Sequence, residues 1–301
     1  DLSTDSFTYT VVDGHGGVAV ATVTVTGEPL PPAVPLETVS IRVTSGAWQT
    51  VSTAHTYTDP VVVCSLVRAD VPLVARVKDV TATSFAVTAQ IASPSLPADA
   101  VSTDGHCVVV ESGVYTMAEH GIAMEAVAFE SSKLAGRGSW GSAYRTERSY
   151  LAPEPYTAPV LFTQVMTTND PALVQSTFVS GTSLSAPPTG TVFRAFRSIS
   201  EQPRPATFSD ETIGVIVVEE GSYIVNDAPL TAVLSALAPR GADNAGAALA
   251  EPPVYTAVYP GAPSVGQAAV VGGHGLNGGN GGWPMLDGAS PMREGAVGVV
   301  W

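Results

Sequence analysis

The segment YTDPVVVC at residues 57–64 returns as YTAPVLFT at residues 156–163, and a shorter relative, YTAV, begins at Tyr255. The three tyrosines of these phrases are separated by 99 residues each time. Self-similarity at a fixed interval is the sequence signature of a repeat architecture. The sequence of 301 residues is therefore predicted to contain three small tandem modules.

The segments around these phrases have the pattern of β-strands. They are short runs rich in Val, Thr, Ile and Phe, separated by Gly, Pro, Asp, Asn and Ser, as in SFAVTAQI (84–91) and TIGVIVVE (212–219). Helical signals are nearly absent, and AEHGIAMEAVAFE (118–130) is ambiguous because Gly121 lies inside it. We predict an all-β chain of tandem antiparallel β-sandwich modules of the Ig-like or lectin-like type.

Repeats and linkers divide the chain into five predicted segments. The proline-rich stretch EPLPPAVPL (28–36) favours an extended spacer, and a stretch rich in small residues (238–253) separates the last two repeats. The segments are a C-terminal hairpin (1–27), a Pro-rich linker (28–35), β-sandwich repeats 36–130 and 131–237, and a shortened third repeat with a Gly-rich loop (238–301). The chain opens inside a strand pattern and stops on an apolar run, so we expect a piece of a longer protein.

The charge balance narrows the classes of partner. With 27 acidic and 13 basic residues, the net charge of −14 argues against binding to nucleic acid or to an anionic membrane. Apolar runs stay well below 18 residues, so we predict no membrane insertion. Only 13% of residues are charged, and weakly charged sheet faces and edges invite pairing. We therefore expect contacts with copies of itself or with sibling repeats in a filament.

Cysteine occurs twice, at Cys64 and Cys107, in short apolar runs that read as strands of one repeat. We predict a disulfide between them, which agrees with an extracellular location at a cell surface or on an appendage. The alternative is two reduced cysteines that act as small core residues.

The sequence lacks the motifs of common catalytic centres. It contains no G-x-S-x-G, and its five histidines are scattered without the spacing of a metal site. The pattern G-x-G-x-x-G starts at Gly273, but no strand-then-helix context surrounds it. We predict that the chain is not an enzyme and that it has no cofactor, calcium excepted.

The calcium hypothesis belongs to the first segment. DSFTYTVVDGHGGVAVATVTVT (5–26) resembles the last hairpin of a cadherin-like tandem repeat found in very large bacterial surface proteins. Its D-G-x-G-G turn supplies the positive φ values that a tight hairpin needs. The resemblance covers only the tail of that repeat, so the family's calcium ligands are not carried over. Asp1, Asp5 and Asp13 are the candidate calcium ligands, with solvated turn residues as the alternative.

The next module is similar to six-stranded H-type lectin-like sandwiches and their relatives in giant adhesins. The match runs through SGAWQTV (45–51), the first YTDP phrase and the strands after it, on Trp48, Pro60, Arg76 and Phe85. The resemblance implies a lectin-like fold. The candidate glycan contacts are Trp48, Trp140 and Tyr144, because flat rings stack on sugar faces. The alternative is that such aromatics close the end of a core.

The composition and the Ala- and Pro-rich architecture also resemble algal fibre proteins of the mastigoneme type. Together these features predict an extracellular structural protein, a repeat-module building block of a surface filament or appendage. The alternative function is a lectin-like adhesin that binds glycans.

Overall fold

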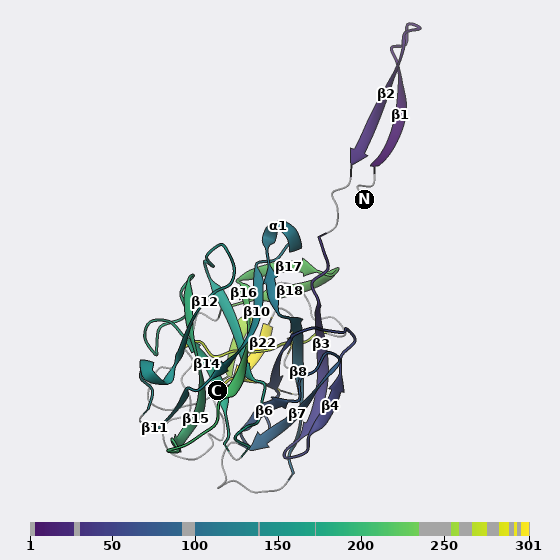
Figure 1. Ribbon diagram of the computed structural model, residues 1–301. Coiled ribbons are helices and arrows are strands. Elements are labelled where there is room, and N and C mark those ends of the chain that lie inside the picture. Colours follow the sequence, from purple (N-terminus) through teal and green to yellow (C-terminus); the bar gives the residue numbers. More distant parts are fainter. Residues whose placement is uncertain are drawn as a thin grey trace. The chain divides into compact units, whose positions relative to one another are not determined.

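A computed structural model describes residues 4–26, 31–91, 100–137, 139–171, 173–234, 254–258, 267–275, 283–288, 292–293 and 296–300. It consists almost entirely of antiparallel β-sheets, which confirms the predicted all-β fold class (Figure 1). The chain divides into two compact units, Asp1–Ala33 and Val34–Trp301, and each is described by itself. Among the described residues, no helix is both long enough and apolar enough to cross a membrane.

The first unit contains the hairpin of β1 (Thr4–Val12) and β2 (Val18–Thr26). The strands pair antiparallel in an unbroken register from Thr4↔Thr26 to Val12↔Val18. In the turn, Gly14 and Gly16 have φ values of 71° and 97°, a left-handed region that glycine adopts without strain. The carboxylate of Asp13 accepts hydrogen bonds from the backbone N–H groups of His15 and Gly17, both at 2.8 Å. The turn chemistry expected from D-G-x-G-G is present.

The first sandwich is built from residues that follow the linker. One sheet has the order β3-β8-β5 and the facing sheet the order β4-β7-β6. The strands are β3 (Leu36–Thr44), β4 (Gln49–Ser52), β5 (Pro60–Leu66), β6 (Leu73–Lys78), β7 (Ser84–Ile91) and β8 (Ser102–Glu111). Every residue of β5 is buried, which accounts for the unbroken apolar run PVVVC that follows Asp59.

The second sandwich repeats this arrangement. Its sheets have the orders β13-β16-β10-β9 and β11-β15-β12, and β14 also pairs with β15. The elements are β9 (Gly113–Tyr115), α1 (Met117–His120), β10 (Met124–Ser131), β11 (Leu134–Arg137), the 3-10 helix η1 (Ser142–Tyr144), β12 (Thr146–Ser149), β13 (Pro159–Val165), β14 (Ser176–Ser180), β15 (Val192–Pro203) and β16 (Glu211–Glu219). In each sandwich the closing strand lies between two others, one of which follows the Y-T-x-P phrase. Strand β8 lies between β3 and β5, and β16 lies between β10 and β13.

The boundary between the two repeats differs from the predicted one at residue 130. Strand β10 pairs with β16 along its whole length, from Met124↔Val218 to Ser131↔Glu211, so it belongs to the second sandwich. The stretch 118–130 is mostly this strand, with a helix of one turn before it. The helix ends at Gly121, which has a φ of 70° and stops further helical growth.

The end of the chain contributes a hairpin and a further sheet. The hairpin pairs β17 (Gly221–Val225) with β18 (Ala228–Ala232), and the sheet has the order β19-β22-β20 with β21 paired to β22. The strands of the sheet are β19 (Val254–Val258), β20 (Met285–Leu286), β21 (Met292–Arg293) and β22 (Ala296–Val300). The pairing of β19 with β22 joins the third YTA phrase to the last apolar run.

The two sandwiches share a hydrophobic core at their junction, and the second sandwich has a further core of its own. Alternate residues of β16 serve two cores: Val215 and Val217 pack inside the second sandwich, whereas Ile216 and Val218 pack in the same cluster as Val63 of the first. A sheet buried on both faces needs apolar residues at every position, which is why TIGVIVVE lacks the alternation of a half-exposed strand. The repeats are therefore packed together rather than spaced apart.

Candidate functional site

The repeated Y-T-x-P phrase is held in the same way in both sandwiches. In the first, the carboxylate of Glu111 accepts hydrogen bonds from the backbone N–H groups of Thr58 at 2.7 Å and Asp59 at 2.8 Å. In the second, the carboxylate of Glu219 accepts from Thr157 and Ala158, both at 2.8 Å. A carboxylate that accepts two backbone N–H groups makes charge-assisted bonds, which are stronger than neutral ones.

A tyrosine four residues after each of these glutamates donates a hydrogen bond to the glutamate's backbone carbonyl. The hydroxyl of Tyr115 donates to the carbonyl of Glu111 at 2.7 Å, and that of Tyr223 donates to the carbonyl of Glu219 at 2.8 Å. Burial, followed by the nearby charge of Glu111, raises the pKa of Tyr115 to about 12. In both sandwiches the glutamate of the motif E-x-G-x-Y therefore binds the backbone of the Y-T-x-P phrase. The repeated sequence corresponds to a repeated set of hydrogen bonds.

A second glutamate in the first strand of each sandwich supports the loop before the phrase. The carboxylate of Glu37 accepts from the N–H of Ala54 at 2.8 Å and from the hydroxyl of Tyr57 at 3.2 Å. In the second sandwich, Oε2 of Glu125 accepts from the N–H groups of Leu151 and Ala152 at 2.7 and 2.8 Å. Its Oε1 is buried without a hydrogen-bond partner in the described structure, and burial raises the pKa of this carboxyl.

The predicted disulfide is present. Cys64 of β5 lies directly opposite Cys107 of β8 in the antiparallel register, with an S–S distance of 2.06 Å. Because the bond closes a loop across 43 residues, the chain-entropy model gives it a stabilisation of about 4 kcal/mol. The disulfide has a structural role, because both cysteines are buried in the core at the junction of the two sandwiches.

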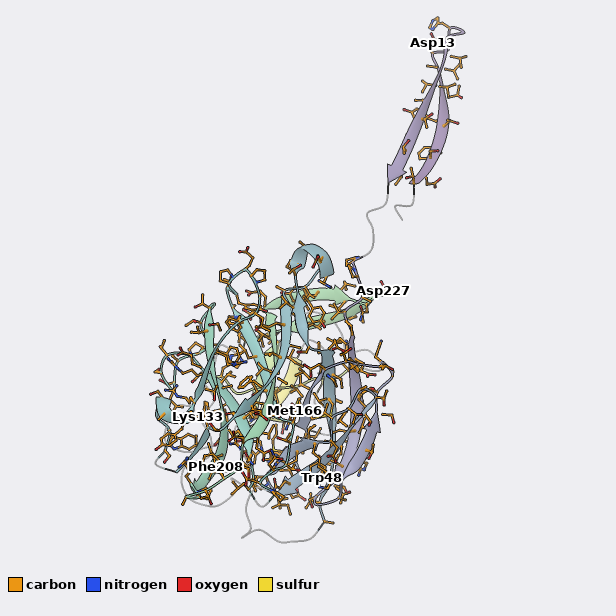
Figure 2. The ribbon with its side chains drawn as sticks, in the orientation of Figure 1. Asp13, Trp48, Lys133, Met166, Phe208 and Asp227 are labelled. Carbon is orange, nitrogen blue, oxygen red and sulfur yellow. A yellow bond between two sulfur atoms is a disulfide. The ribbon has the colours of Figure 1, made fainter. Side chains whose placement is uncertain are left out.

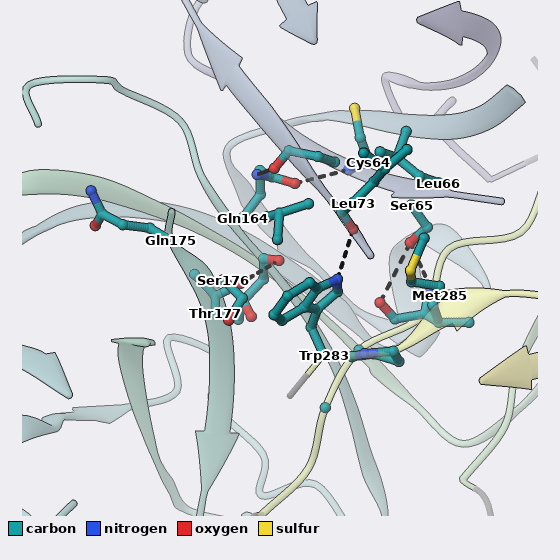
Figure 3. Close-up of a pocket in the computed structure, with 17 residues that line it drawn as sticks. Cys64, Ser65, Leu66, Leu73, Gln164, Gln175, Ser176, Thr177, Trp283 and Met285 are labelled. Carbon is teal, nitrogen blue, oxygen red and sulfur yellow. Dashed lines mark hydrogen bonds between the residues drawn. The ribbon is translucent and has the colours of Figure 1, made fainter. Parts of the chain in front are cut away.

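Two strand edges of the first sandwich, those of β5 and β6, are covered by Gln164 of β13 and by Met166, the residue after β13. Gln164 accepts from the N–H of Cys64 on β5 at 3.4 Å and donates its Nε2 to the carbonyl of Ala75 on β6 at 3.0 Å (Figure 3). Met166, which is labelled in Figure 2, is buried and places its sulfur 3.3 Å from the N–H of Val62. Unpaired strand edges invite association with other chains, and this junction satisfies two of them internally.

Segments close to the Gly-rich stretch complete this junction. The N–H of Val271 donates to the hydroxyl of Ser65 at 2.9 Å, and the indole of Trp283 donates to the carbonyl of Leu73 at 2.7 Å (Figure 3). A side chain on Gly272 would collide with the carbonyl oxygen of Leu161, so glycine is required there. Of the predicted Gly-rich loop, residues 272–275 pack against β13 and β14, and residues 276–282 lie outside the described part.

A cavity of about 50 Å³ lies at the junction, lined in part by Gln164, Gln175, Trp283 and Met285 (Figure 3). Pockets that bind small organic ligands have volumes of about 300–1,000 Å³, whereas about 10–15 Å³ suffices for one water molecule. The cavity therefore has room for a few water molecules, and it is too small for a sugar ring.

The candidate glycan contacts are not brought together in one site. Trp48 precedes β4, keeps 40% of its surface exposed, and carries the ammonium group of Lys78 4.7 Å from its ring centroid. Trp140 and Tyr144 instead pack over the buried side chains Phe178 and Phe196 on the second sandwich. Trp140 and Tyr144 therefore have a structural role, because they shield the stacked rings of Phe178 on β14 and Phe196 on β15 from water.

The candidate calcium ligands are also separated. Asp5 lies at the open end of the hairpin and Asp13 at its turn, eight residues along one strand, which is about 27 Å. Asp1 lies outside the described residues. Among the described residues, no group of three or more His, Cys, Asp and Glu side chains is placed to hold a metal ion.

Comparisons with protein-family models, with curated proteins and with solved structures found no match for this chain.

Proposed function

We propose that the chain is an extracellular structural protein, a repeat-module building block of a surface filament or appendage, without enzymatic activity. The observation that carries this proposal is the shared core of the two sandwiches, whose edges are joined by Gln164 and Met166. Such a junction makes a rigid unit of two repeats, as a load-carrying fibre requires. The disulfide is compatible with an oxidising, extracellular location.

The partners in this proposal are further copies of the chain or sibling repeats, because contacts between identical units that do not close produce filaments. The direct test is sedimentation velocity of the purified chain over a concentration series. We expect species that grow with concentration without added ligand or metal. A single monomeric species at the highest concentration would count against the proposal.

A lectin-like adhesin is the second candidate, favoured by one observation. Trp48 is half-exposed beside Lys78 on the outer face of β4 and β6, an arrangement that offers a ring and a charge to a sugar. A glycan array with the wild-type chain and a Trp48→Ala variant tests it. Binding that depends on Trp48 would favour the adhesin, whereas self-association without any sugar favours the filament.

A further inference from the structure

The outer edge of β3 has no neighbouring strand. Strand β3 stands at the end of the sheet β3-β8-β5, so only its inner edge is paired, with β8. The N–H of Glu111 donates to the carbonyl of Pro35 at 2.9 Å, and this bond sets which residues face β8, because the facing edge alternates along an antiparallel strand. The residues whose N–H and C=O groups point away from β8 are Leu36, Thr38, Ser40 and Arg42. Among the described residues, these backbone groups have no hydrogen-bond partner.

In the second sandwich, β10 corresponds to β3. The carbonyl of Ala123, directly before β10, accepts the N–H of Glu219 at 2.9 Å, as the carbonyl of Pro35 accepts that of Glu111. The two strands also begin alike, β3 with L-E-T-V and β10 with M-E-A-V. Their outer edges can therefore be compared residue by residue.

The outer edge of β10 is occupied. Strand β9 lies along it in the antiparallel register Met124↔Tyr115 to Ala126↔Gly113. In the chain, β9 begins two residues after Glu111, the last residue of the closing strand β8. The end of one repeat thus supplies the edge strand of the next.

The hairpin of β17 and β18 repeats this pairing. Strand β18 contains L-T-A, which corresponds to L-E-T of β3 and M-E-A of β10. Strand β17 lies along β18 in the register Leu230↔Tyr223 to Ala232↔Gly221. Both β9 and β17 follow a closing strand within the motif E-x-G-x-Y. Two of the three corresponding strands therefore carry an E-x-G-x-Y strand in the same register, and β3 lacks one.

The sequence contains no further strand of this kind. Gly-x-Tyr occurs in the 301 residues only at Gly113 and Gly221, which belong to β9 and β17. The eight residues before β3 include four prolines, which cannot donate to a strand ladder. Asn226 accepts from the N–H of Val34 at 3.0 Å and donates to its carbonyl at 2.6 Å, which closes the edge just before Leu36. From Leu36 onward the edge is open to a strand from another molecule.

Resting on the proposed assembly, we propose that the outer edge of β3 binds an E-x-G-x-Y strand donated by a sibling repeat of another chain. The donated tyrosine lies opposite Leu36 and the donated glycine opposite Thr38, antiparallel to β3. Backbone hydrogen bonds provide the binding, as in other proteins in which a peptide adds a strand to the edge of a sheet. Because Asn226 occupies Val34, the donated strand ends at its tyrosine, as β9 does.

The test supplies the missing strand on the same chain. A copy of residues 109–117 is fused to the N-terminus of the full chain through a flexible Gly-Ser linker, which raises its local concentration to the millimolar range. A control fusion carries proline in place of the copy's tyrosine, because proline has no N–H for the ladder. We expect hydrogen exchange of the Leu36 and Thr38 amides to be about tenfold slower in the first fusion than in the control. Equal exchange in the two fusions would overturn the proposal.

The outer edge of β4 serves as the internal control. The N–H of Thr53 donates to the carbonyl of Thr83 at 2.9 Å, so the amides of Thr50 and Ser52 point away from β7. Their exchange should be the same in both fusions. Slowing of these amides to the same extent as those of β3 would show unspecific edge pairing and would overturn the assignment.

Free peptides of residues 109–117 give a second arm. N-methylation of Tyr115 in the peptide removes an N–H that faces the partner strand, whereas N-methylation of Val114 removes one that faces away. In NMR titrations of the ¹⁵N-labelled full chain, the first peptide should bind about tenfold more weakly than the second. Equal affinities would contradict the proposed register.

These results are distinguishable from those of the filament test, because the fused strand needs no second copy. A protected β3 edge in the fusion, together with a wild-type chain that stays monomeric, would overturn the filament proposal alone. Wild-type species that grow with concentration, together with an unprotected edge in the fusion, would overturn this contact alone.

Discussion

Glu125 and Glu211 are buried carboxylates whose pKa values are shifted in opposite directions. Burial raises the pKa of Glu125, and the N–H groups of Ala152 and Leu151 offset this only in part. Burial also acts to raise the pKa of Glu211, but hydrogen bonds from Thr167, Asp170, Asn169 and Gln175 outweigh it, and the pKa is lowered. The local hydrogen bonds, rather than burial alone, decide the sign.

Opposite shifts predict opposite effects of pH on stability. Because its pKa is raised in the folded state, Glu125 contributes most to the free energy of unfolding below its unfolded pKa of about 4.5. This contribution is lost as pH rises through the folded-state pKa. The lowered pKa of Glu211 gives a contribution present above about 4.5 and lost as pH falls.

The wild-type chain should lose stability as pH rises above about 4.5, because the buried Glu125 carboxyl then becomes charged. Glu125→Gln should abolish this pH-dependent loss, because the amide is uncharged and its oxygen still accepts from Leu151 and Ala152. Glu211→Gln should destabilise by about 1–3 kcal/mol at neutral pH, since both of its oxygens accept hydrogen bonds. It should also weaken the acid-side dependence. Urea unfolding midpoints across pH measure both, and parallel curves for the two variants would contradict this explanation.

The disulfide gives another prediction at this scale. Replacement of Cys64 and Cys107 together by alanine should lower the free energy of unfolding by about 4 kcal/mol, because the unfolded chain regains the freedom of the closed loop. Chemical denaturation with and without reductant measures it. A loss below about 1 kcal/mol would mean that the bond contributes little beyond its packing.

At the scale of elements, Gln164 joins an edge of each sheet of the first sandwich to β13. Gln164→Leu keeps the volume but leaves the N–H of Cys64 and the carbonyl of Ala75 unpaired and buried. We expect a loss of about 2–4 kcal/mol in the free energy of unfolding. Gln49→Leu, on the exposed β4, is the matched control and should change stability by less than about 0.5 kcal/mol. Equal effects of the two would contradict the joining role of Gln164.

Local chemistry allowed several elements to be predicted from the sequence. The D-G-x-G-G turn, the strand runs and the pairing of Cys64 with Cys107 follow from glycine conformations, residue periodicity and the apolar setting of the cysteines. The unbroken apolar run of β16 was also visible, although the sequence does not state that two different cores cause it.

The features that the sequence did not predict depend on contacts between segments that are distant in the chain. The boundary at residue 130 differs because β10 pairs with β16, some 85 residues later in the chain, and no local signal marks that choice. Gln164 and Glu125 were missed because a single polar residue in an apolar strand shows nothing of its partner. Comparison of the two copies was the available signal for the glutamates, since Glu37 and Glu125 occupy equivalent registers, opposite Val109 and Val217.

At the scale of the whole molecule, the shared core predicts cooperative unfolding of the two sandwiches. Val63 and Val87 of the first and Ile216 and Val218 of the second belong to one buried cluster, so unfolding of either sandwich exposes buried apolar surface of the other. Scanning calorimetry should show a single transition for Val34–Trp301 within the full chain, with calorimetric and van't Hoff enthalpies in agreement. Two separate transitions of similar size would show that the repeats are independent domains.

The measurement that tests the proposed role most directly is negative-stain electron microscopy of the purified chain at high concentration. We expect filaments with a regular axial repeat, formed without added sugar. Dispersed single particles under the same conditions would contradict the structural role.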